Sequence, residues 1–418
     1  MKSNNSFDYP NNLQIIFDKL IKNNIRPIII GGYVRDFFLD IKSKDIDIEL
    51  YGVSSLDKLE KILQEFGTIN NVGKSFGVCK LSFEGMQIDF TLPRIDNKIS
   101  SGHRGFDIKV NPELDFKTAT TRRDFTVNTI AYDVQNKKIL DLFYGIKDLK
   151  SKTLRAVNNN SFKEDPLRVL RAVGFSSRFA FKMDDELFSL CKKMCNENIL
   201  NELAKERIFT ELKKILLKSP EPSIAFFLLK ELNGLKYLTP LESLNDNNFS
   251  IVLNSLDNIS KLKTNSNKTN IALMLAILCY RFNTGEITKF ILNLTSEKNL
   301  LKSILTLVNN NFKTSYSDSE LLHLSTKVNI ENFLIFNKAL NDSYNDEIFN
   351  TIKERAKELN ILNEKITPLL GGKDIMACGI KPSKRYSMIL NDAYEAQLNL
   401  EITTYKEAKK WLEKYLVI

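Results

Sequence analysis

The fold of the N-terminal part is decided by one stretch, Lys44-Asp45-Ile46-Asp47-Ile48-Glu49-Leu50. Its strict alternation predicts a β-strand with the apolar residues on one face and Asp45, Asp47 and Glu49 on the other. On a strand, side chains two residues apart lie about 6.5–7 Å from each other, so Asp45 and Asp47 point the same way. Two such carboxylates suit hard cations that prefer oxygen ligands. The alternative is a half-exposed strand whose acids are simply solvated.

A pair of glycines precedes this strand. Gly31 and Gly32 follow the apolar residues 27–30 and lead into a helical stretch that contains Arg35. Glycine allows backbone amides to approach a phosphate closely at the start of a helix. A glycine pair is a weak signal alone. Together with Asp45 and Asp47 it favours a phosphoryl-transfer site over solvated acids.

A third carboxylate is expected from a neighbouring strand. Residues 86–92 alternate in the same way and offer Asp89, while Glu84 or Glu49 are alternatives. Three acids suit two Mg²⁺ ions about 3.5–4 Å apart, which activate an attacking 3′-hydroxyl and neutralise charge on the triphosphate and leaving pyrophosphate. The predicted catalytic and metal-binding residues are therefore Asp45, Asp47 and Asp89.

The sequence pattern changes near residue 155. Before it, helical patches alternate with short β-like runs at residues 27–30, 46–50, 78–83, 86–92 and 128–133. After it, helical periodicity continues to the end of the 418 residues. The predicted fold class is α+β, with a small mixed β-sheet and helices first and helices alone afterwards. The length suggests several domains, with a break expected at residues 219–222 and a linker at residues 309–319.

Composition indicates which partners and which cellular compartment to expect. The net charge of +9 weakly favours a polyanionic partner. No apolar run approaches the roughly 20 residues of a membrane span, and no signal peptide can be drawn. Five scattered cysteines argue against a disulfide framework and are expected to be buried thiols. A soluble, cytoplasmic protein without membrane contact is expected.

Five segments form a series in the first half of the chain. They are residues 31–36 with 45–47, residues 122–128, residues 141–149 with 154–155, residues 164–171, and residues 206–212. In this order they resemble the motifs of the class II tRNA nucleotidyltransferases (CCA-adding enzymes) and bacterial poly(A) polymerases. The C-terminal residues 370–398 also resemble family tails, although Ser383 stands where a glycine is common.

The resemblance implies a domain order and a reaction. It implies a nucleotidyltransferase head at residues 1–150, a helical neck that recognises the base at 151–218, a helical body at 219–320 and a tRNA-binding tail at 321–418. The implied activity is Mg²⁺-dependent addition of C, C and A from CTP and ATP to tRNA, with the tRNA 3′ end and acceptor stem as partners and no obligate protein partner. Residues 97–105 would form a loop over the site.

The resemblance also implies nucleotide-binding residues. Asp124 would hold the ribose hydroxyls, and the neighbouring arginines would hold sugar and triphosphate. The full implied set is Gly31, Gly32, Arg35, Arg122, Arg123, Asp124, Asn128, Asp165, Arg168 and Arg171. For the charged run at residues 122–124, the alternative is a solvated surface.

Base choice is assigned to Asp165 and Arg168. Three residues apart in a helical pattern, they would share one face, and Arg171 would extend it one turn later. Cytosine and adenine both present an amino donor beside a ring-nitrogen acceptor, which a carboxylate and a guanidinium can match. Guanine and uracil have the inverse polarity. The alternative is an ordinary surface salt bridge.

Three other functions remain open at this stage. The motifs barely separate CCA addition from poly(A) synthesis or from addition of only C or only A. A catalytically silent tRNA-binding protein is a further alternative, which the intact acids argue against.

Overall fold

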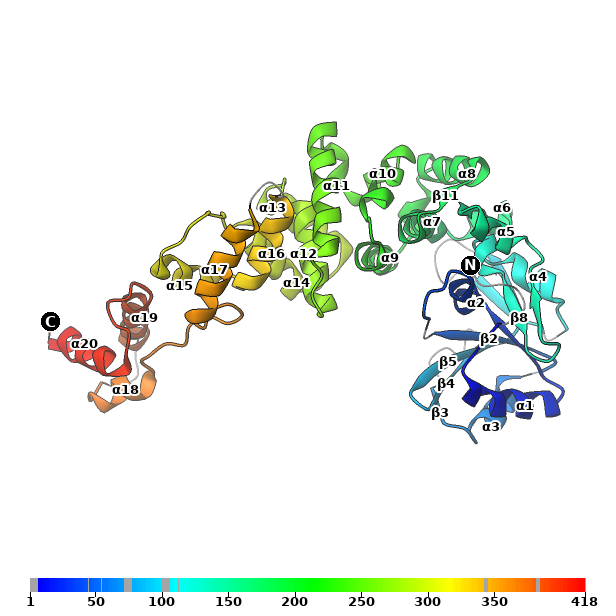
Figure 1. Cartoon of the computed structure of the whole chain (residues 1–418), viewed down its shortest axis with the longest axis horizontal. Helices are drawn as coiled ribbons and strands as arrows, with labels where there is room; N and C mark the ends of the chain where they lie inside the picture. The colour runs from blue at the N-terminus through cyan, green and yellow to red at the C-terminus, as the bar shows by residue number, and fades with distance from the viewer. Residues whose placement is uncertain are drawn as a thin grey trace. The chain divides into compact units, whose positions relative to one another are not determined.

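The computed structural model describes residues 7–43, 45–53, 55–70, 77–98, 106–111, 113–341, 345–380 and 384–417. It divides into two compact units, Met1–Glu242 and Ser243–Ile418, whose elements are labelled in Figure 1. The first unit contains the sheet and the second contains helices, so the predicted α+β class is confirmed. The four-part domain division stays a prediction.

A seven-stranded mixed sheet forms the centre of the head. Its strand order is β3-β4-β5-β2-β1-β8-β9. Their bounds are β1 Arg26–Ile30, β2 Ile46–Tyr51, β3 Thr68–Asn70, β4 Val78–Phe83, β5 Met86–Thr91, β8 Ala131–Asp133 and β9 Lys138–Leu140. Strand β2 runs antiparallel to β1 but parallel to β5. The parallel pair matters most, because it sets Asp47 beside Asp89.

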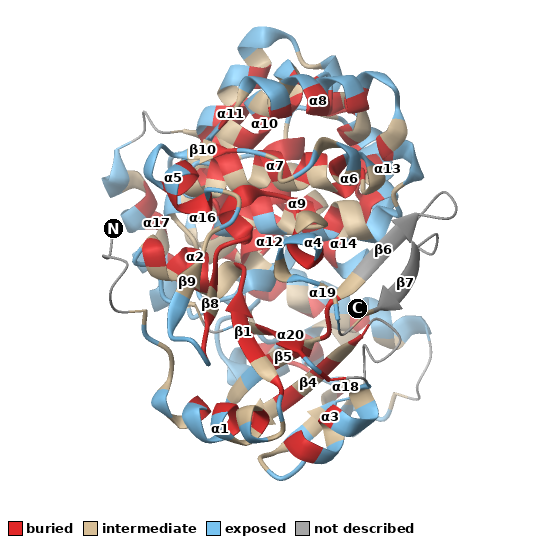
Figure 2. Cartoon of the chain, turned by 90° about the vertical axis from the view of Figure 1, so that its right-hand side faces the viewer, coloured by how far each residue is buried: buried red, intermediate tan, exposed pale blue. Residues whose placement is uncertain are grey.

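Apolar side chains explain why β1 lies inside this sheet, between β2 and β8. Ile28, Ile29 and Ile30 are all buried, and Figure 2 shows β1 as a largely buried strand. Such a continuous apolar run is typical of a strand covered on both faces. The helices of the head are α1 Gln14–Lys22, α2 Gly32–Phe38, α3 Leu56–Leu63, α4 Phe116–Thr121 and α5 Gly145–Lys150.

Five further helices follow the sheet in the same unit. They are α6 Asn159–Glu164, α7 Leu167–Phe179, α8 Asp185–Asn196, α9 Lys205–Lys218 and α10 Ser223–Glu231. Helix α7 packs against both α9 and α10. A Cβ on Gly174 would lie 3.2 Å from Ile215 Cγ1, so the missing side chain lets α7 and α9 approach closely.

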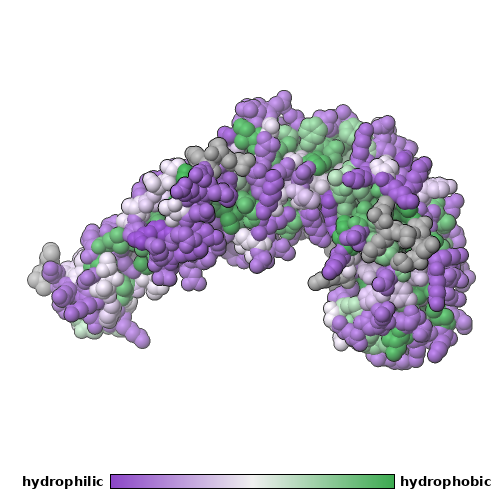
Figure 3. All heavy atoms as spheres, in the orientation of Figure 1, coloured by the Kyte–Doolittle hydropathy of each residue, from purple (hydrophilic) through white to green (hydrophobic). Residues whose placement is uncertain are grey.

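The second unit is built around a helix whose residues 271–279 are all apolar. Its helices are α11 Asp246–Lys261, α12 Asn267–Cys279, α13 Thr284–Leu294, α14 Lys298–Val308, α15 Asp318–Lys327, α16 Ile330–Leu340, α17 Asp346–Glu358, α18 Gly372–Ala377, α19 Lys384–Leu398 and α20 Tyr405–Val417. Every residue from 271 to 279 in α12 is buried, and α11, α14 and α16 pack around it. Among the described helices, none combines the length and hydropathy needed to cross a bilayer. On the face seen in Figure 3, the surface of this unit is mainly hydrophilic.

Several predicted elements need correction. The strand expected at residues 128–133 is shorter, because residues 126–128 form a 3-10 helix, η3 Thr126–Asn128. Strands β3, β9 and the separate pair β6 Arg94–Lys98 and β7 Phe106–Val110 were not predicted, and the helical part opens with a two-residue pairing of β10 Thr153–Leu154 with β11 Lys182–Met183. Four cysteines are buried thiols as expected, but Cys378 is exposed.

Candidate nucleotidyl-transfer site

The predicted metal-binding acids lie close together on and beside the parallel strands β2 and β5. Asp47 and Asp89 are direct partners in the register of β2 and β5. Neighbouring residues in register point to the same face of a sheet. Asp45 is exposed just before β2, and Asp47 is half-buried. Two strands and the residue before one of them thus carry three acids in one neighbourhood.

The surroundings of Asp47 leave it with excess negative charge. Burial raises the pKa of Asp47 above its ordinary value, and the charges of Asp89 and Asp45 raise it further, while Arg123 and Lys80 oppose the shift. A carboxylate crowded by other carboxylates is stabilised by an added cation. The electrostatics therefore fit a divalent ion at this position.

The third metal ligand is less clearly placed. Lys80 Nζ donates to Asp89 Oδ2 at 2.6 Å. Within the described part of the chain, no three His, Cys, Asp or Glu side chains gather closely enough to hold an ion. Ligation by Asp89 therefore stays a prediction that requires its side chain to leave Lys80.

The two alternatives for the third ligand have other roles. Glu84 lies in the β4–β5 turn and accepts a hydrogen bond from Asn12 Nδ2 at 2.6 Å. Glu49 is fully buried and accepts a hydrogen bond from the Tyr51 hydroxyl at 2.5 Å. Its other oxygen lies 3.5 Å from Arg122 Nη2 and 3.7 Å from Arg123 Nη2. Glu49 thus anchors both arginines of the second segment.

Gly31 brings the glycine pair into the same site. Its φ is +82°, a conformation that side chains disfavour. A Cβ there would also lie 3.0 Å from Arg123 Nη1 and 3.8 Å from Asp47 Oδ2. A glycine is therefore required where α2 begins, and the structure brings Gly31, Asp47 and Arg123 together.

A buried polar chain connects the head to helix α7. Arg35 donates to Asp36 Oδ1 at 2.8 and 2.6 Å and to Asn128 Oδ1 at 2.6 Å. Asn128 in turn donates to Asp124 Oδ1 at 2.9 Å. The Arg35 guanidinium also lies 4.8 Å from the centre of the Phe179 ring of α7. Arg35 is committed to protein partners, which suits a positioning residue, and its predicted contact with nucleotide stays untested.

Asp124 is the last residue in this series of hydrogen bonds and pairs with an arginine. Arg171 of α7 donates to Asp124 Oδ2 through Nε at 2.8 Å and through Nη2. Although burial acts to raise it, the charge of Arg171 and hydrogen bonds from Asn128 and Arg171 lower the pKa of Asp124 to about 2. Arg171 also lies 4.0 Å from Glu211 Oε1 on α9. Asp124 is held ionised and in a fixed orientation.

The expected helical face of Asp165 and Arg168 is wrong in one respect. Helix α7 begins at Leu167, and Asp165 precedes it in an extended conformation, with φ −119° and ψ 99°. Pro166 explains this, because the residue before a proline is pushed out of the helical region. Asp165 Oδ1 instead accepts a hydrogen bond from the backbone amide of Leu167 at 3.2 Å.

Asp165 pairs with an arginine that the sequence did not single out. Arg207 Nη2 lies 3.1 and 3.0 Å from the two carboxylate oxygens of Asp165, reaching across from α9. Arg168 points elsewhere, donating to the backbone carbonyls of Ser161 at 2.9 Å and Arg122 at 2.5 Å. The fifth segment contains Arg207, so its place in that segment was the available signal.

Comparison with known proteins agrees with this geometry. Residues 28–155 match the family model described as "Poly A polymerase head domain", and residues 180–242 match "Probable RNA and SrmB- binding site of polymerase A". A CCA-adding enzyme of Ligilactobacillus salivarius is 29% identical over 96% of both chains. The similarity to the tRNA nucleotidyltransferase and poly(A) polymerase family thus extends over most of the chain.

Other relatives of this family are similar over part of their length. A multifunctional CCA protein of Pseudoalteromonas atlantica is 37% identical over 50% of this chain and 49% of its own. A CCA-adding enzyme of Actinobacillus succinogenes is 33% identical, covering 60% of this chain and 61% of its own. The chain thus spans about half to three fifths of the length of these curated relatives.

Solved structures of the family share the fold. The CCA-adding enzyme of Bacillus stearothermophilus in complex with CTP has a TM-score of 0.77 at 20% identity, covering 97% of this chain and 98% of that one. The Thermotoga maritima CCA-adding enzyme complexed with tRNA has a TM-score of 0.63 at 21% identity, with 97% and 95% covered. Nucleotidyltransferases of this family generally use a divalent metal.

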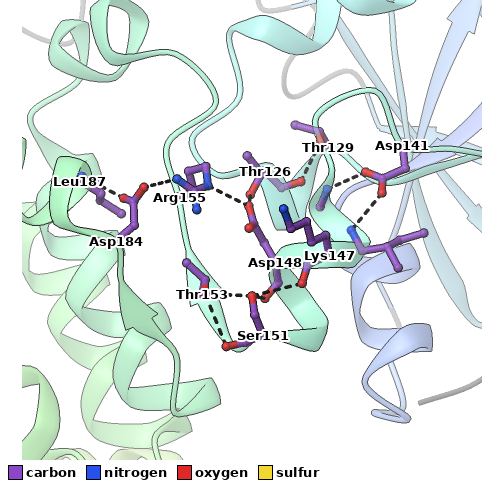
Figure 4. Close-up of polar contacts among 12 residues, drawn as sticks. Thr126, Thr129, Asp141, Lys147, Asp148, Ser151, Thr153, Arg155, Asp184 and Leu187 are labelled. Atoms are coloured by element: carbon purple, nitrogen blue, oxygen red, sulfur yellow. Dashed lines mark hydrogen bonds and ion pairs between the residues drawn. The ribbon is translucent and has the colours of Figure 1, made fainter.

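The third family segment, residues 141–149 with 154–155, connects the sheet region to the helices after it through hydrogen bonds and ion pairs (Figure 4). Asp141 accepts hydrogen bonds from the backbone amides of Gly145 at 2.6 Å and Ile146 at 3.0 Å. Arg155 lies between two acids, with Nε 3.4 Å from Asp148 Oδ2 and Nη1 bonded to Asp184 at the start of α8. One arginine therefore ties α5 of the head to α8 of the neck.

The loop predicted over the site at residues 97–105 lies largely outside the described residues. Only the backbone of residues 97 and 98, at the end of β6, belongs to the described part.

Proposed function

We propose that this protein adds C, C and A in sequence to the 3′ end of tRNA, using CTP and ATP and releasing pyrophosphate. The observation that carries the proposal is the register of β2 and β5, which sets Asp47 beside Asp89 next to the glycine at the start of α2. The relatives named CCA-adding enzymes, one aligned over 96% of this chain, support the same reaction.

Asp45, Asp47 and Asp89 are proposed to hold Mg²⁺. Carboxylate oxygens suit this hard cation, and the charges of Asp45 and Asp89 already act on Asp47. When bound, Mg²⁺ would activate the primer hydroxyl and neutralise charge on the triphosphate. Lys80 would have to release Asp89 for this third ligand to form.

We assign the sugar and triphosphate to the glycines and arginines beside these acids. Gly31 and Gly32 leave room for the phosphates at the start of α2, and Arg122 and Arg123, oriented by Glu49, supply fork-shaped donors. Asp124 and Asn128 face the ribose in this proposal. Arg35 and Arg171 hold that pair in place.

Base choice is assigned to Asp165 together with Arg168. Asp165 would accept from the amino group of cytosine or adenine, and an arginine would donate to the ring nitrogen. Arg207 already holds both oxygens of Asp165, so it orients the carboxylate and is a second candidate donor. A base of inverse polarity leaves these groups unpaired, a mismatch that can discriminate by about 10⁴–10⁵.

The helical body and tail are proposed to hold the tRNA through its shape and phosphates. The net charge of +9 supports contact with a polyanion. We place the protein in the cytoplasm, which agrees with its five free thiols. No obligate protein partner is proposed.

The deciding experiment supplies tRNA that lacks its last three nucleotides. The purified protein receives CTP alone, ATP alone or both, and the products are sized. Two additions with CTP, and a third only when ATP is also present, are expected. Long A runs would identify a poly(A) polymerase, addition of one kind of nucleotide would identify a specialised enzyme, and tRNA binding without any addition would identify a silent binding protein.

Metal dependence is tested in the same assay. Removing divalent ions with EDTA is expected to stop addition, and Mg²⁺ in excess of the chelator is expected to restore it. Full activity in EDTA would contradict the metal site.

A further inference from the structure

The second unit contains a hollow lined by positively charged residues. It lies among helices α12, α14, α15 and α16 and residues 363–365, with a volume of about 390 Å³. Sites for small molecules commonly have volumes of about 300–1,000 Å³. All its lining residues belong to the Ser243–Ile418 unit, which does not include the nucleotidyl-transfer residues.

The charge of this hollow is unbalanced. Its lining includes Lys268, Lys302, Lys327 and Lys365, against one acid, Glu364. No ion pair involves any of these four lysines in the part of the chain that the structure describes. Clustered lysines that outnumber the acids near them repel one another, and an anion relieves that repulsion.

Other lysines nearby in the sequence form ion pairs with acids. Between residues 313 and 357, the chain has five lysines. Four of them pair with acids at 2.7–2.8 Å, namely Lys313 with Glu320, Lys338 with Asp346, Lys353 with Glu331 and Lys357 with Glu354. Lys327, the fifth, faces the hollow and has no such partner among the described residues. Lys327 is thus the exception among the lysines of this stretch.

The hollow combines this charge with neutral donors and an apolar floor. The Thr269 hydroxyl and the Asn332 side-chain amide have no hydrogen-bond partner among the described residues. Leu273, Leu307 and Val328 are buried and line the same space. A ligand with an anionic end and a flat, weakly polar end would match both parts.

A neighbouring hollow extends the cationic lining. It has a volume of about 680 Å³, shares Lys302, Thr306 and Lys327 with the first, and adds Lys298. This continuity leaves room for a chain of phosphates rather than a single one.

We propose that this lysine hollow, defined by Lys268, Lys302, Lys327 and Lys365, binds a free nucleoside di- or triphosphate. The phosphates contact the lysines through charge-assisted hydrogen bonds, and the base lies against the apolar floor. The partly open hollow has room for one nucleotide, and its apolar floor offers contact to a base, whereas a duplex backbone presents only sugar and phosphate. The proposal does not depend on the reaction of the head.

The test uses the full chain in EDTA, with GDP and inorganic pyrophosphate as probes. GDP is chosen because guanine does not match the base polarity proposed for Asp165. Hydrogen exchange measured by mass spectrometry reports each unit separately. We expect GDP to protect backbone amides at residues 302–307 and 325–332, with pyrophosphate binding more weakly because it lacks a base.

Paired variants decide the role of the lysines. K302Q/K327Q should weaken GDP binding, read from this protection, by at least about tenfold, and K302R/K327R should largely restore it. The matched control K261Q/K289Q removes the same charge from exposed lysines outside the hollow and should leave it unchanged.

Four outcomes would overturn the proposal. They are no protection by GDP, equal protection in K302Q/K327Q, pyrophosphate protecting as well as GDP, or protection by tRNA but by no free nucleotide.

Discussion

Carboxylates in two places have opposite surroundings. One place is the metal edge, formed by Asp45, Asp47 and Asp89, and the other is the neck boundary, where Asp124 meets helix α7. At the metal edge, burial and the acids Asp45 and Asp89 raise the pKa of Asp47. At the neck boundary, Asp124 is more deeply buried, yet Arg171 and Asn128 lower its pKa to about 2. The comparison shows that burial alone does not decide the charge of a carboxylate here. The first region leaves negative charge for an added cation, and the second satisfies it with the protein's own arginine.

The strongest test of this contrast removes the acids of the metal edge. D45A/D47A is expected to lower nucleotide transfer by roughly 10³-fold or more, because bound metal supplies several kcal/mol of transition-state stabilisation. Binding of tRNA, measured on filters, should change little. D18A, which removes an exposed acid from α1, is the control and should retain full activity. Undiminished transfer by D45A/D47A would place the metal elsewhere.

The next test removes the internal cation from the neck boundary. R171M leaves Asp124 buried without its charge partner, and such a loss typically costs about 3–5 kcal/mol. Urea unfolding measures this loss of stability. R178M serves as the control, because it loses a cation–π contact with Phe179 worth about 0.5–1 kcal/mol. If R171M were no less stable than R178M, Arg171 would not be the partner that holds Asp124 ionised.

The pH dependence of stability sharpens the same point. The pKa of Asp124 falls from an ordinary 3.8 to about 2 on folding, so its contribution is complete above pH 3.8 and is lost as pH falls towards 2. The shift corresponds to about 2 kcal/mol. The free energy of unfolding of the wild type should therefore exceed that of D124N at neutral pH, and the difference should shrink below about pH 4. An equal difference at pH 3 and pH 7 would contradict the lowered pKa.

The smallest expected effect concerns the lysine at the metal edge. K80M frees Asp89 from its ion pair, so the Mg²⁺ concentration for half-maximal transfer should fall by about two- to fivefold. The pair is partly exposed, and its loss should change stability by less than about 1 kcal/mol. K58M, on the exposed side of α3, is the control. A higher Mg²⁺ requirement in K80M would mean that Lys80 assists the site instead of competing with the metal.

Local pattern predicted the centre of the sheet well. The alternating stretches became β2, β4 and β5 almost residue for residue. Short strands such as β3 and β9 have three residues each, too few for alternation to register. The 3-10 helix at residues 126–128 interrupts a run that is apolar enough to suggest a strand.

The site depended on contacts that spacing does not reveal. Asp89 was expected on a neighbouring strand, and β5 does lie beside β2, but the ion pair with Lys80 comes from β4. Arg207 is 42 residues from Asp165 and reaches it only because α9 packs on α7. Pro166 predicts that Asp165 lies outside the helix, whereas the helical periodicity of the residues after it gives no sign of this.

The pairing of Asp165 with Arg207 has a kinetic consequence for the proposed base selection. If Arg207 turns to donate to the ring nitrogen of the incoming base, it gives up at least one of the Asp165 oxygens that it holds at 3.0–3.1 Å, and the amino group of the base takes its place. Binding is then an exchange of partners rather than entry into a vacant slot. A base with the wrong polarity cannot complete the exchange, so the guanidinium returns and the base leaves before transfer. Under this scheme discrimination resides in dissociation rates, with the protein's own arginine as the standing competitor for every nucleotide.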